Sequence, residues 1–470
     1  MEFKHFRGSF LIIFEKLIEI PLIVLGVLAS IFLLKNFDMQ ALVPVVFILL
    51  SPISKLVNYF FTYYTLTEDY MIVESGVFTK KRTEIPFSTI TTVDLSQNIL
   101  FQLFKVYKIK VDNSSQTNEI ANKSNVILTL KIEEAILFKQ KITKSSELQE
   151  VKVKDSAQQH DEINTNLLDF VKLGLLQSKL VYIFSIFAVA GPLFGVISPN
   201  LKNTFVGALL IFAIIIIYVI AVGMSVIKSV VTYYNFKVWS EEDVLKVQYG
   251  LFNKKSFSLQ KGKISGIILK QSLLMKLCKL YTVEAIVIGY GDNSEDNGKE
   301  KAIIFPIASM DRIKEIVNIV LPEYSLDYSL CKPEPRALRY FFINPVLVFT
   351  VISFISALTI SILTNIYFII AFASLFLAIS IVGAILGFLN AGISIGESNV
   401  VLSAGSYSKK IAVIKTKSIE SVTASGTIFK RRKGIISIKL GFIAPLRLSN
   451  ISTKNIPVTQ FDLLEGVLKY

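Results

Sequence analysis

The sequence predicts an α+β membrane protein: six transmembrane helices form three hairpins, and each hairpin is followed by a small antiparallel β domain with a C-terminal helix. Composition is the first observation behind this fold class. Hydrophobic residues make up 52% of the 470 residues, charged residues make up 18%, and the mean hydropathy is +0.56. These values exclude a mainly disordered chain and disfavour a purely soluble one. The second observation is that apolar runs come in pairs, separated by polar segments that repeat one another.

The apolar runs have the length that a membrane-spanning helix needs. At about 1.5 Å per residue, about 20 mostly apolar residues cross the roughly 30 Å of hydrocarbon. Six such runs pair as 18–34 with 41–61, 181–197 with 206–227, and 345–363 with 366–388. The first run begins late, lacks a small-residue cleavage site and is followed at once by the second, which disfavours a cleaved signal peptide.

Lys and Arg residues beside the spans predict the orientation. The short breaks inside the hairpins hold only Lys35 and Lys202, whereas the opposite ends are richly basic. Those ends carry Lys4, Arg7, Lys16, Lys228, Lys237, Lys332, Arg336 and Arg339. Because basic residues favour the cytoplasmic side, we expect a multi-pass protein of the cell membrane with both termini and all three β domains in the cytoplasm.

The polar segments share a motif, glycine followed by x-[Phe/Tyr]-x-Lys-Lys. Its glycine and lysines are Gly76, Lys80 and Lys81; Gly250, Lys254 and Lys255; and Gly405, Lys409 and Lys410. Ile90, Ile264 and Ile419 follow at the same offset. Gln97 matches Gln271 in the first two segments, as Tyr107 matches Tyr281. Such a repeat indicates three copies of one small domain.

Short β-branched stretches at 70–73, 400–402 and 435–438 predict strands. The repeated glycine is typical of a hairpin turn that needs a positive φ, with the lysine pair on the returning strand. Amphipathic segments at 133–144, 311–321 and 460–470 predict a closing helix. In 311–321, Ile313, Ile316, Val317 and Val320 share one face, while Arg312, Lys314 and Glu315 face water. Each copy is therefore expected to be a small β-sandwich or split barrel capped by a helix.

The predicted organisation alternates membrane hairpins with these domains. It consists of an N-terminal segment with hairpin 1 (1–61), β domain 1 (62–144), a linker with an amphipathic segment (145–180), hairpin 2 (181–228), β domain 2 (229–323), a linker (324–344), hairpin 3 (345–389) and β domain 3 (390–470).

Paired apolar helices followed by the segment YTLTEDYMIVESGVFTKKRTEIPFSTITTVDLSQNILFQLFKVYKIKV resemble the bacterial pleckstrin-homology-like (PH-like) domain proteins of the YdbT type. The resemblance covers nearly the whole chain and implies a PH-like fold for each copy. It also implies a role in resistance or immunity against membrane-active bacteriocins or other antimicrobial peptides, beside a smaller PH-like-domain membrane protein as partner. The third copy departs from the pattern, because Ile428-Phe429-Lys430-Arg431-Arg432 replaces Ile99-Leu100-Phe101-Gln102-Leu103.

Residues that carry enzyme chemistry are scarce. His5 and His160 lie far apart without neighbouring ligands, and Cys278 and Cys331 have no metal-binding spacing. The sequence contains no P-loop, H-E-x-x-H or G-x-S-x-G motif. The Gly- and Asn-rich stretch 289–298 fits neither a nucleotide loop nor a calcium loop and reads as a solvated hairpin loop. We therefore expect no catalytic residues, cofactor or metal, and a protein that is not an enzyme.

A basic cluster in the third copy is the strongest candidate for binding. Residues 391–470 hold twelve Lys or Arg and four Asp or Glu. Lys430, Arg431, Arg432 and Lys433 are consecutive, and each basic residue near an anionic leaflet contributes about 1 kcal/mol. Anionic lipid contact and a merely solvated basic face both remain open. Nucleic acid is disfavoured because no aromatic residues are interleaved with the cluster.

These observations predict a non-enzymatic membrane protein whose PH-like domains act as interaction or lipid-contact modules. One alternative is a subunit of a transporter or exporter, for which Lys55, Pro52 and Gly191-Pro192 within the spans are the candidate residues. A general envelope-stress scaffold is the other.

Overall fold

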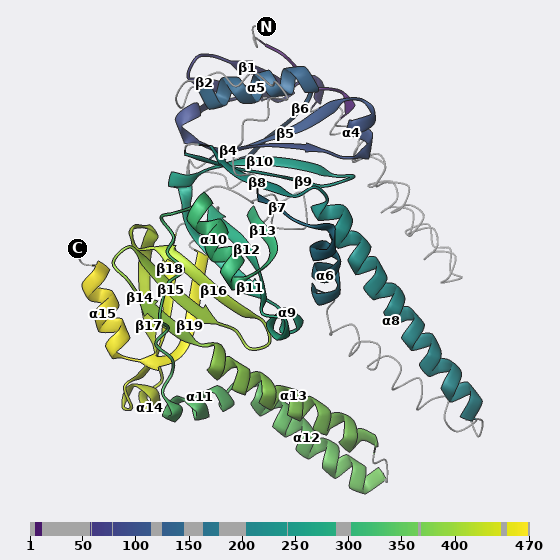
Figure 1. Ribbon diagram of the computed structural model, residues 1–470, viewed down its shortest axis with the longest axis vertical. Coiled ribbons are helices and arrows are strands. Elements are labelled where there is room, and N and C mark those ends of the chain that lie inside the picture. Colours follow the sequence, from purple (N-terminus) through teal and green to yellow (C-terminus); the bar gives the residue numbers. More distant parts are fainter. Residues whose placement is uncertain are drawn as a thin grey trace. The chain divides into compact units, whose positions relative to one another are not determined.

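The computed structural model describes residues 5–11, 57, 59–77, 79–113, 125–144, 163–177, 204–241, 243–287, 302–364, 368–442 and 449–468 (Figure 1). The chain divides into two compact units. Unit 1 comprises Met1–Glu162, Asn235–Gln260 and Gly289–Glu300, and unit 2 comprises Ile163–Tyr234, Lys261–Ile288 and Lys301–Tyr470. The boundary after Gln260 falls inside the second repeat, so the units do not coincide with the repeats.

All three repeats contain the same elements in the same order: three strands, a 3-10 turn, a strand, a short helix, two strands and a closing helix. Repeat 1 has β1 (Tyr63–Leu66), β2 (Tyr70–Ser75), β3 (Lys81–Pro86), η2 (Phe87–Thr89), β4 (Ile90–Gln97), α4 (Ile99–Leu103), β5 (Val106–Asn113), β6 (Asn125–Lys131) and α5 (Ile132–Lys144). Repeat 2 has β8 (Lys237–Glu241), β9 (Val244–Tyr249), β10 (Lys254–Gln260), η4 (Lys261–Lys263), β11 (Ile264–Gln271), α9 (Leu273–Leu277), β12 (Leu280–Val287), β13 (Ala302–Ser309) and α10 (Met310–Val320). Repeat 3 has β14 (Gly392–Ile395), β15 (Asn399–Ala404), β16 (Lys409–Lys415), η6 (Thr416–Ser418), β17 (Ile419–Ser425), α14 (Ile428–Arg431), β18 (Ile435–Phe442), β19 (Ser449–Pro457) and α15 (Thr459–Leu468). The predicted internal repeat is confirmed at this level.

Repeat 1, which lies wholly in unit 1, has a single apolar core. Its strands form two three-stranded groups, β1–β3 and β4–β6, and α5 packs against β5 and β6 (Figure 1). Met71, Ile109, Val111 and Phe138 are fully buried in one shared apolar cluster. Because burying a side chain of this size contributes about 1.5–3 kcal/mol, the two groups and the helix stabilise one another.

Repeats are joined by strand pairing. In unit 1, β4 pairs antiparallel with β10, which makes one sheet of order β6-β5-β4-β10-β9-β8. In unit 2, β11 pairs antiparallel with β16, which makes a sheet of order β13-β12-β11-β16-β15-β14. We call the pairing of the fourth strand of one repeat with the third strand of the next a joint. Each joint places six strands from two repeats in one hydrogen-bonded sheet.

The two joints have the same register. In the first, Lys254 lies opposite Gln97 and Leu259 opposite Thr92. In the second, the equivalent Lys409 lies opposite Gln271, and Ile414 lies opposite Gly266. The joint is therefore a repeated feature of this chain and not an accident of one contact.

The repeated glycines occupy the turns that the motif predicts. Gly76, Gly250 and Gly405 have φ of 120°, 112° and 120°. A Cβ atom added to Gly405 would lie 1.9 Å from the carbonyl oxygen of Ser408, so only glycine fits. Lys254 and Lys409 begin the returning strands β10 and β16, while β3 begins at Lys81.

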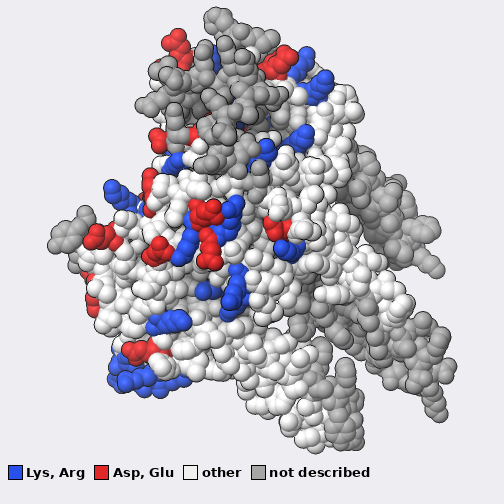
Figure 2. All heavy atoms as spheres, viewed as in Figure 1, with Lys and Arg blue, Asp and Glu red and all other residues white. Residues whose placement is uncertain are grey.

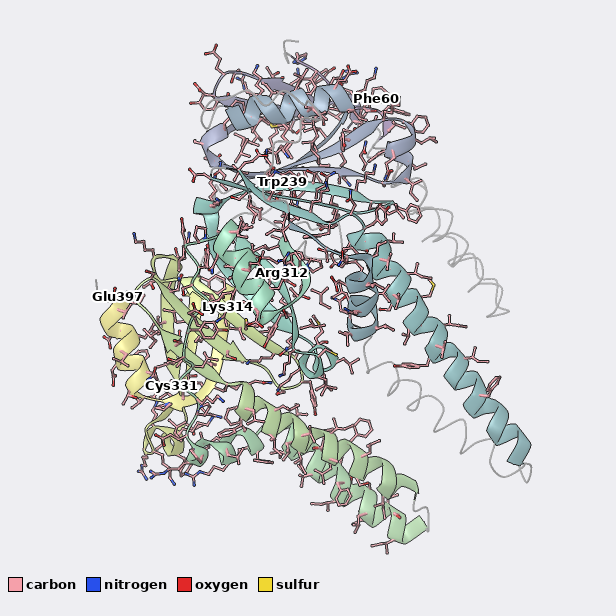
Figure 3. The ribbon with its side chains drawn as sticks, viewed as in Figure 1. Phe60, Trp239, Arg312, Lys314, Cys331 and Glu397 are labelled. Carbon is pink, nitrogen blue, oxygen red and sulfur yellow. The ribbon has the colours of Figure 1, made fainter. Side chains whose placement is uncertain are left out.

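The helix of repeat 2 has the predicted amphipathic face. Ile313, Ile316, Val317 and Val320 of α10 are buried. Figure 3 labels Arg312 and Lys314, whose side chains both come from this helix. Arg312 and Glu315 form an exposed ion pair at 2.7 Å, as expected for the solvent face of a helix.

Among the described residues, unit 2 contains five helices outside the repeats. They are α6 (Leu167–Gln177), α8 (Thr204–Tyr233), α11 (Leu338–Phe342) after the turn η5 (Pro335–Ala337), α12 (Pro345–Thr364) and α13 (Phe368–Asn390); a short strand, β7, covers Ile163–Asn164. Helix α6 packs closely along α8, because Gly174 has no side chain: a Cβ atom there would lie 2.5 Å from Cα of Val226. Helices α12 and α13 pack side by side (Figure 1).

The prediction of six transmembrane helices in three hairpins is wrong, although the antiparallel β domains with C-terminal helices are present. Among the described residues, one helix is long and apolar enough to cross a membrane, over Ala373–Asn390 of α13. A second qualifies only if the segments Pro335–Phe342 and Val346–Ile362, bent by 56°, count as one span. The described apolar part of α8, Tyr218–Tyr233, is shorter than the roughly 20 residues that a crossing needs, although α8 itself is 30 residues long. The runs 18–34 and 181–197, and 41–61 except for residues 57 and 59–61, lie outside the described residues.

Apolar composition alone misled the prediction because it counts residues and does not register where a helix bends or stops. In the run 345–363 the straight apolar part covers Val346–Ile362, and it reaches the length of a span only together with Pro335–Phe342, from which it is bent by 56°. The described parts of α12 and α13 nevertheless contain no charged residue, and their surface is white in Figure 2.

A glycine pair in repeat 3 tests the turn geometry. Gly405→Ala should lower the free energy of unfolding by about 2–3 kcal/mol, because alanine is strained at φ 120° and its Cβ meets Ser408. Gly466→Ala is the matched control: it lies in α15 with nothing within 4 Å of the added Cβ, and should be neutral or stabilising by about 0.5–1 kcal/mol. Thermal unfolding of both variants measures the difference, and equal melting temperatures would contradict the assignment.

Candidate functional site

A basic cavity lies beneath repeat 3, where α11 and α13 meet the β17–β19 sheet. Its volume is about 480 Å³, and its lining includes Lys430, Lys439 and Lys454 together with Ser425 and Ser437. Among the residues that the structure describes, no Asp or Glu lines it. The cavity therefore presents cations and hydroxyl groups without a carboxylate to balance them, which suits an anionic ligand.

Strand geometry aims two of these lysines at the cavity. Lys439 lies on β18, between Ile438 and Leu440, whose side chains are buried in the core on the other face of the sheet. Because side chains alternate along a strand, Lys439 faces outward. Lys454 lies on the neighbouring strand β19 and is exposed in the same way, next to the buried Thr453.

The third lysine comes from α14, which α11 holds in place. The hydroxyl of Tyr340 on α11 donates a hydrogen bond of 3.1 Å to the carbonyl oxygen of Phe429. The ammonium of Lys430 lies 5.5 Å from the centre of the Tyr340 ring, within range of a cation–π contact. Helix α11 leads directly into α12, so the basic end of repeat 3 is tied to the start of the apolar hairpin.

The glycine turn of repeat 3 fastens the other side of the cavity to α13. Asn390, the last residue of α13, donates hydrogen bonds of 2.9 Å from Nδ2 to the carbonyl oxygens of Gly405 and Ser406. The hydroxyl of Tyr407 donates a hydrogen bond to the carbonyl oxygen of Ile379. Gly383 makes room for that tyrosine, since a Cβ atom there would lie 2.6 Å from its oxygen. In this repeat the turn of the motif is therefore hydrogen-bonded to the apolar helix α13 at two points.

The lysines of the site crowd one another. Partial burial lowers the pKa of Lys430, and the nearby Lys454 lowers it further. Lys409, which does not line the cavity, also has a lowered pKa because of burial, and Lys276 and Lys332 add to that effect. A bound anion would offset this repulsion, because an opposite charge stabilises the protonated amine.

The three copies of the motif have different surroundings. Lys81 is exposed at the start of β3 in unit 1, and Lys254 and Lys255 lie in the first joint, opposite Gln97 and Ser96. Lys409 and Lys410 lie in the second joint, opposite Gln271 and Lys270. The predicted cluster 430–433 is also divided: Lys430 is half-buried at the cavity, whereas Arg431, Arg432 and Lys433 are exposed. They belong to the basic patch at the lower left of Figure 2, over α14.

Sequence reasoning missed the exposed apolar residues of the short helices. Ile428 and Phe429 of α14 are 70% and 73% exposed. Leu103 in α4 and Leu277 in α9, in the other repeats, are 76% and 78% exposed. The comparison of aligned positions showed only that α14 has basic residues where α4 has apolar ones. It did not show that all three short helices expose apolar side chains. It also missed Lys439 and Lys454, for which strand alternation was the available signal.

Several other candidate residues have no described site around them. Within the described residues no group of three or more His, Cys, Asp and Glu could hold a metal ion, and Cys278 and Cys331 are free. Pro52, Lys55, His160, Gly191-Pro192 and most of the stretch 289–298 lie outside the described residues. The absence of catalytic residues, cofactor and metal stays a prediction.

Six-stranded β repeats closed by a helix, with a basic site at the base of an apolar hairpin, define the class as membrane proteins built from PH domains. The bacterial PH domain family model matches residues 19–145, 186–323 and 346–468, so the chain belongs to the bacterial PH domain family. It is similar to the UPF0699 transmembrane protein YdbT of Bacillus subtilis (strain 168), with 23% identity over 300 residues. The match covers 59% of this chain and 60% of the relative's length. No solved structure matches the chain significantly. The predicted resemblance is confirmed.

Removing the cavity lysines should weaken retention of anionic phospholipid. Lys439→Gln with Lys454→Gln removes two cationic contacts of about 1 kcal/mol each, so affinity should fall about thirtyfold. Native mass spectrometry of the full chain with phosphatidylglycerol measures the bound lipid. Lys417→Gln is the matched control, because this residue lies in η6 of the same repeat and does not line the cavity. Equal losses in both variants would mean that the cavity does not bind the headgroup.

Proposed function

We propose that this membrane protein is a non-enzymatic lipid-contact and interaction module whose third repeat binds anionic phospholipid headgroups. The observation that carries the proposal is the cavity of Lys430, Lys439 and Lys454, which no carboxylate lines and which Gly383 and Gly387 of α13 border. A phosphate at this place meets cations and hydroxyl donors while its acyl chains lie beside an apolar helix. Phosphate and lysine pair well as point charges, particularly where partial burial limits screening by water.

Helix α14 supports the same function from outside the cavity. Its exposed Ile428 and Phe429 stand next to the exposed Arg431 and Arg432. Apolar side chains that enter the boundary of the acyl chains, flanked by cations that meet phosphates, are the composition by which peripheral segments bind a membrane surface. The short helices α4 and α9 expose apolar residues too, but repeat 3 combines them with the densest basic cluster.

We further propose that α12 and α13 enter the bilayer together and that the repeats and both termini face the cytoplasm. Arg336 and Arg339 precede α12, and the basic cluster of α14 is bonded to that same end through Tyr340. Basic residues gathered at one end of an apolar hairpin favour the cytoplasmic side. Neither helix contains an ionisable residue, so a membrane anchor fits this hairpin better than an ion or proton pathway of a transporter subunit.

A fluorescent probe at Phe429 tests the lipid contact. In a full chain with Cys278→Ser and Cys331→Ser, an environment-sensitive dye on Phe429→Cys should shift to the blue in nanodiscs containing phosphatidylglycerol, relative to pure phosphatidylcholine, because α14 would enter the interface. Replacing Arg431, Arg432 and Lys433 by Gln should remove most of that shift.

The matched control places the dye on Glu397→Cys, in the turn between β14 and β15. Figure 3 shows Glu397 beside α15, at the end of the β14–β19 domain away from α14, so no lipid-dependent shift is expected there. A membrane-impermeant thiol reagent should label Phe429→Cys only after cell lysis. Labelling in intact cells, or equal shifts at both positions, would overturn the proposal.

Resistance to membrane-active bacteriocins, with a smaller PH-like-domain membrane protein as partner, is the physiological role that we propose. Its support is the resemblance to YdbT-type proteins, together with a site that would compete with cationic peptides for anionic lipid. Direct electrostatic binding of a cationic bacteriocin peptide needs acidic groups, and among the described residues no Asp or Glu lines the cavity. Competition for lipid is therefore the favoured mechanism, and a general envelope-stress scaffold is the alternative.

Challenge of a sensitive host tests this role. Cells that express the chain with the smaller partner should tolerate a severalfold higher concentration of a pore-forming bacteriocin than cells with empty vector. The variant with Lys430, Arg431, Arg432 and Lys433 replaced by Gln should lose the protection at equal membrane abundance. Unchanged sensitivity would remove the role, and protection without loss in the variant would favour the scaffold.

A further inference from the structure

Two strands at the ends of the repeat array have unused edges. Strand β3 is the edge of the sheet β1-β2-β3, and β17 is the edge of the sheet β17-β18-β19. Among the described residues neither pairs with a further strand. Their counterparts all do: β10 and β16, the equivalents of β3, and β4 and β11, the equivalents of β17, make up the two joints. Among the described residues, one half of a joint of each kind is therefore left without a partner strand.

The common register of the joints says how these halves would fit. Lys255 lies opposite Ser96 and Lys410 opposite Lys270, at the same repeat positions. Carried over by equal offset from the repeated glycines, this register places Lys81 of β3 opposite Ser425 of β17. Thr83 then lies opposite Thr423, and Ile85 opposite Ser421.

The buried faces of the two edge strands also match the joint. In the first joint, Val93 and Leu95 of β4 belong to the core of repeat 1, and Leu95 lies opposite the half-buried Ser256, not opposite the buried Phe257. The two repeats therefore place their cores on opposite faces of the shared sheet. The two edge strands also have one face that packs on a core: Ile85 belongs to the core of repeat 1, and Val422 and Ala424 pack against the core of repeat 3. In the transferred register, Ile85 is not opposite Val422 or Ala424. The same holds in the first joint, where Leu95 is not opposite Phe257.

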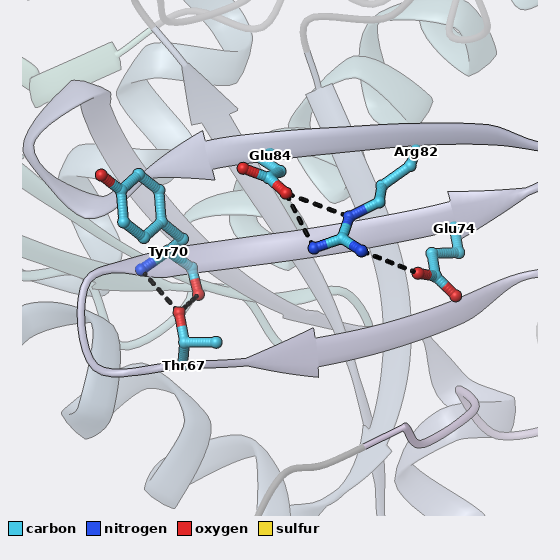
Figure 4. Close-up of polar contacts among 5 residues, drawn as sticks. All are labelled: Thr67, Tyr70, Glu74, Arg82 and Glu84. Carbon is cyan, nitrogen blue, oxygen red and sulfur yellow. Dashed lines mark hydrogen bonds and ion pairs between the residues drawn. The ribbon is translucent and has the colours of Figure 1, made fainter.

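The edges themselves carry features that restrict pairing without preventing it. Figure 4 shows Arg82 of β3 held across the sheet surface by Glu84 at 2.8 Å and by Glu74 at 3.8 Å. Charges on an edge strand discourage indiscriminate sheet growth, while leaving the backbone groups available to a matched partner. Pro86, which lacks a donor, lies one position beyond the last residue of the transferred register, where Gln260 and Lys415 also have no partner across the joints.

We propose that β17 of one copy of this chain pairs antiparallel with β3 of a second copy, which makes a third joint between molecules. A second copy is the occupant that the structure favours, because each chain carries one unused half of each kind and the two kinds complement each other. The contact is heterologous, so successive copies form either an open row or a closed ring. It goes beyond lipid binding and does not depend on it.

The joint between copies is expected to be weaker than those within the chain. At the position of Gln97 and Gln271, repeat 3 has Gly426. The amides of Gln97 and Gln271 donate hydrogen bonds of 2.9 and 3.1 Å to the carbonyl oxygens of Val106 and Leu280, which braces the end of each internal joint. Without that brace, and with the association entropy to overcome, the outer joint should form reversibly and depend on protein density.

Disulfide trapping between two chains tests the register. Both chains carry Cys278→Ser and Cys331→Ser; one also carries Thr83→Cys and the other Thr423→Cys, with different tags. Opposite residues on paired strands bring the two Cα atoms within the 4.4–6.8 Å or so that a disulfide needs. Co-expression should give a mixed disulfide dimer about tenfold more abundant than the dimer of either variant alone.

The matched control pairs Thr83→Cys with Glu420→Cys, three residues out of register and therefore about 10 Å further along the strand, where no disulfide should form. Equal dimer from either single variant would indicate pairing of like edges and overturn the proposal. A further chain carries both Thr83→Cys and Thr423→Cys, and a disulfide that forms only within this single chain would also overturn the proposal. So would a disulfide between Thr423→Cys and a different, smaller protein.

A second test uses the wild-type chain, because the cysteine variants could fail to associate simply through misfolding. Two wild-type copies with different tags should co-purify from the same membranes, and Thr83→Pro should reduce co-purification about tenfold, because proline removes a donor and blocks a matched edge. Failure of the wild-type copies to co-purify would overturn the proposal, as would undiminished co-purification of the proline variant at normal melting temperature.

Discussion

Backbone hydrogen bonding across the joints is the constraint on which the rest of the structure depends. A strand edge leaves a row of donors and acceptors that must be satisfied by another strand, by water or by cover. In this chain β4 and β11 satisfy theirs with β10 and β16 of the following repeat, in one repeated register. The consequence is that compact units form across repeats: the second repeat contributes β8–β10 to unit 1 and β11–β13 to unit 2.

This arrangement makes the repeats interdependent, as in other arrays whose stability comes from interfaces between neighbours. It also explains why the terminal repeats differ from the middle one. The edge strands β3 and β17 are largely exposed and polar, whereas β11, which is paired on both sides, reads Ile-Ser-Gly-Ile-Ile-Leu and is mostly buried. Gln97 and Gln271 brace strands that lie in joints, and Gly426 stands where no described joint exists.

Charge and apolar surface meet at the base of α13. The glycine turn of the third repeat is hydrogen-bonded to that helix through Asn390 and Tyr407. Lys439 and Lys454, on strands of the same repeat, line the cavity beside it. Lysines without a carboxylate partner are costly where solvent is limited, which lowers the pKa of Lys430. A phosphate group of a membrane lipid supplies the missing charge, so the position of the cavity and its electrostatics favour the same ligand.

The sequence by itself determined the local features: three repeats, a glycine of positive φ in each turn, and the buried face of α10, because these depend on residues only a few positions apart. Within the described residues it overestimated the spans, because composition does not reveal how long the straight part of an apolar helix is. It pointed to Lys430 through a visible run of charges but missed Lys439 and Lys454, which are isolated in the chain. Only the tertiary structure decided which strands pair across repeats and which lysines share a cavity, because those neighbours are far apart in sequence and are brought together by packing and by the need to satisfy strand edges.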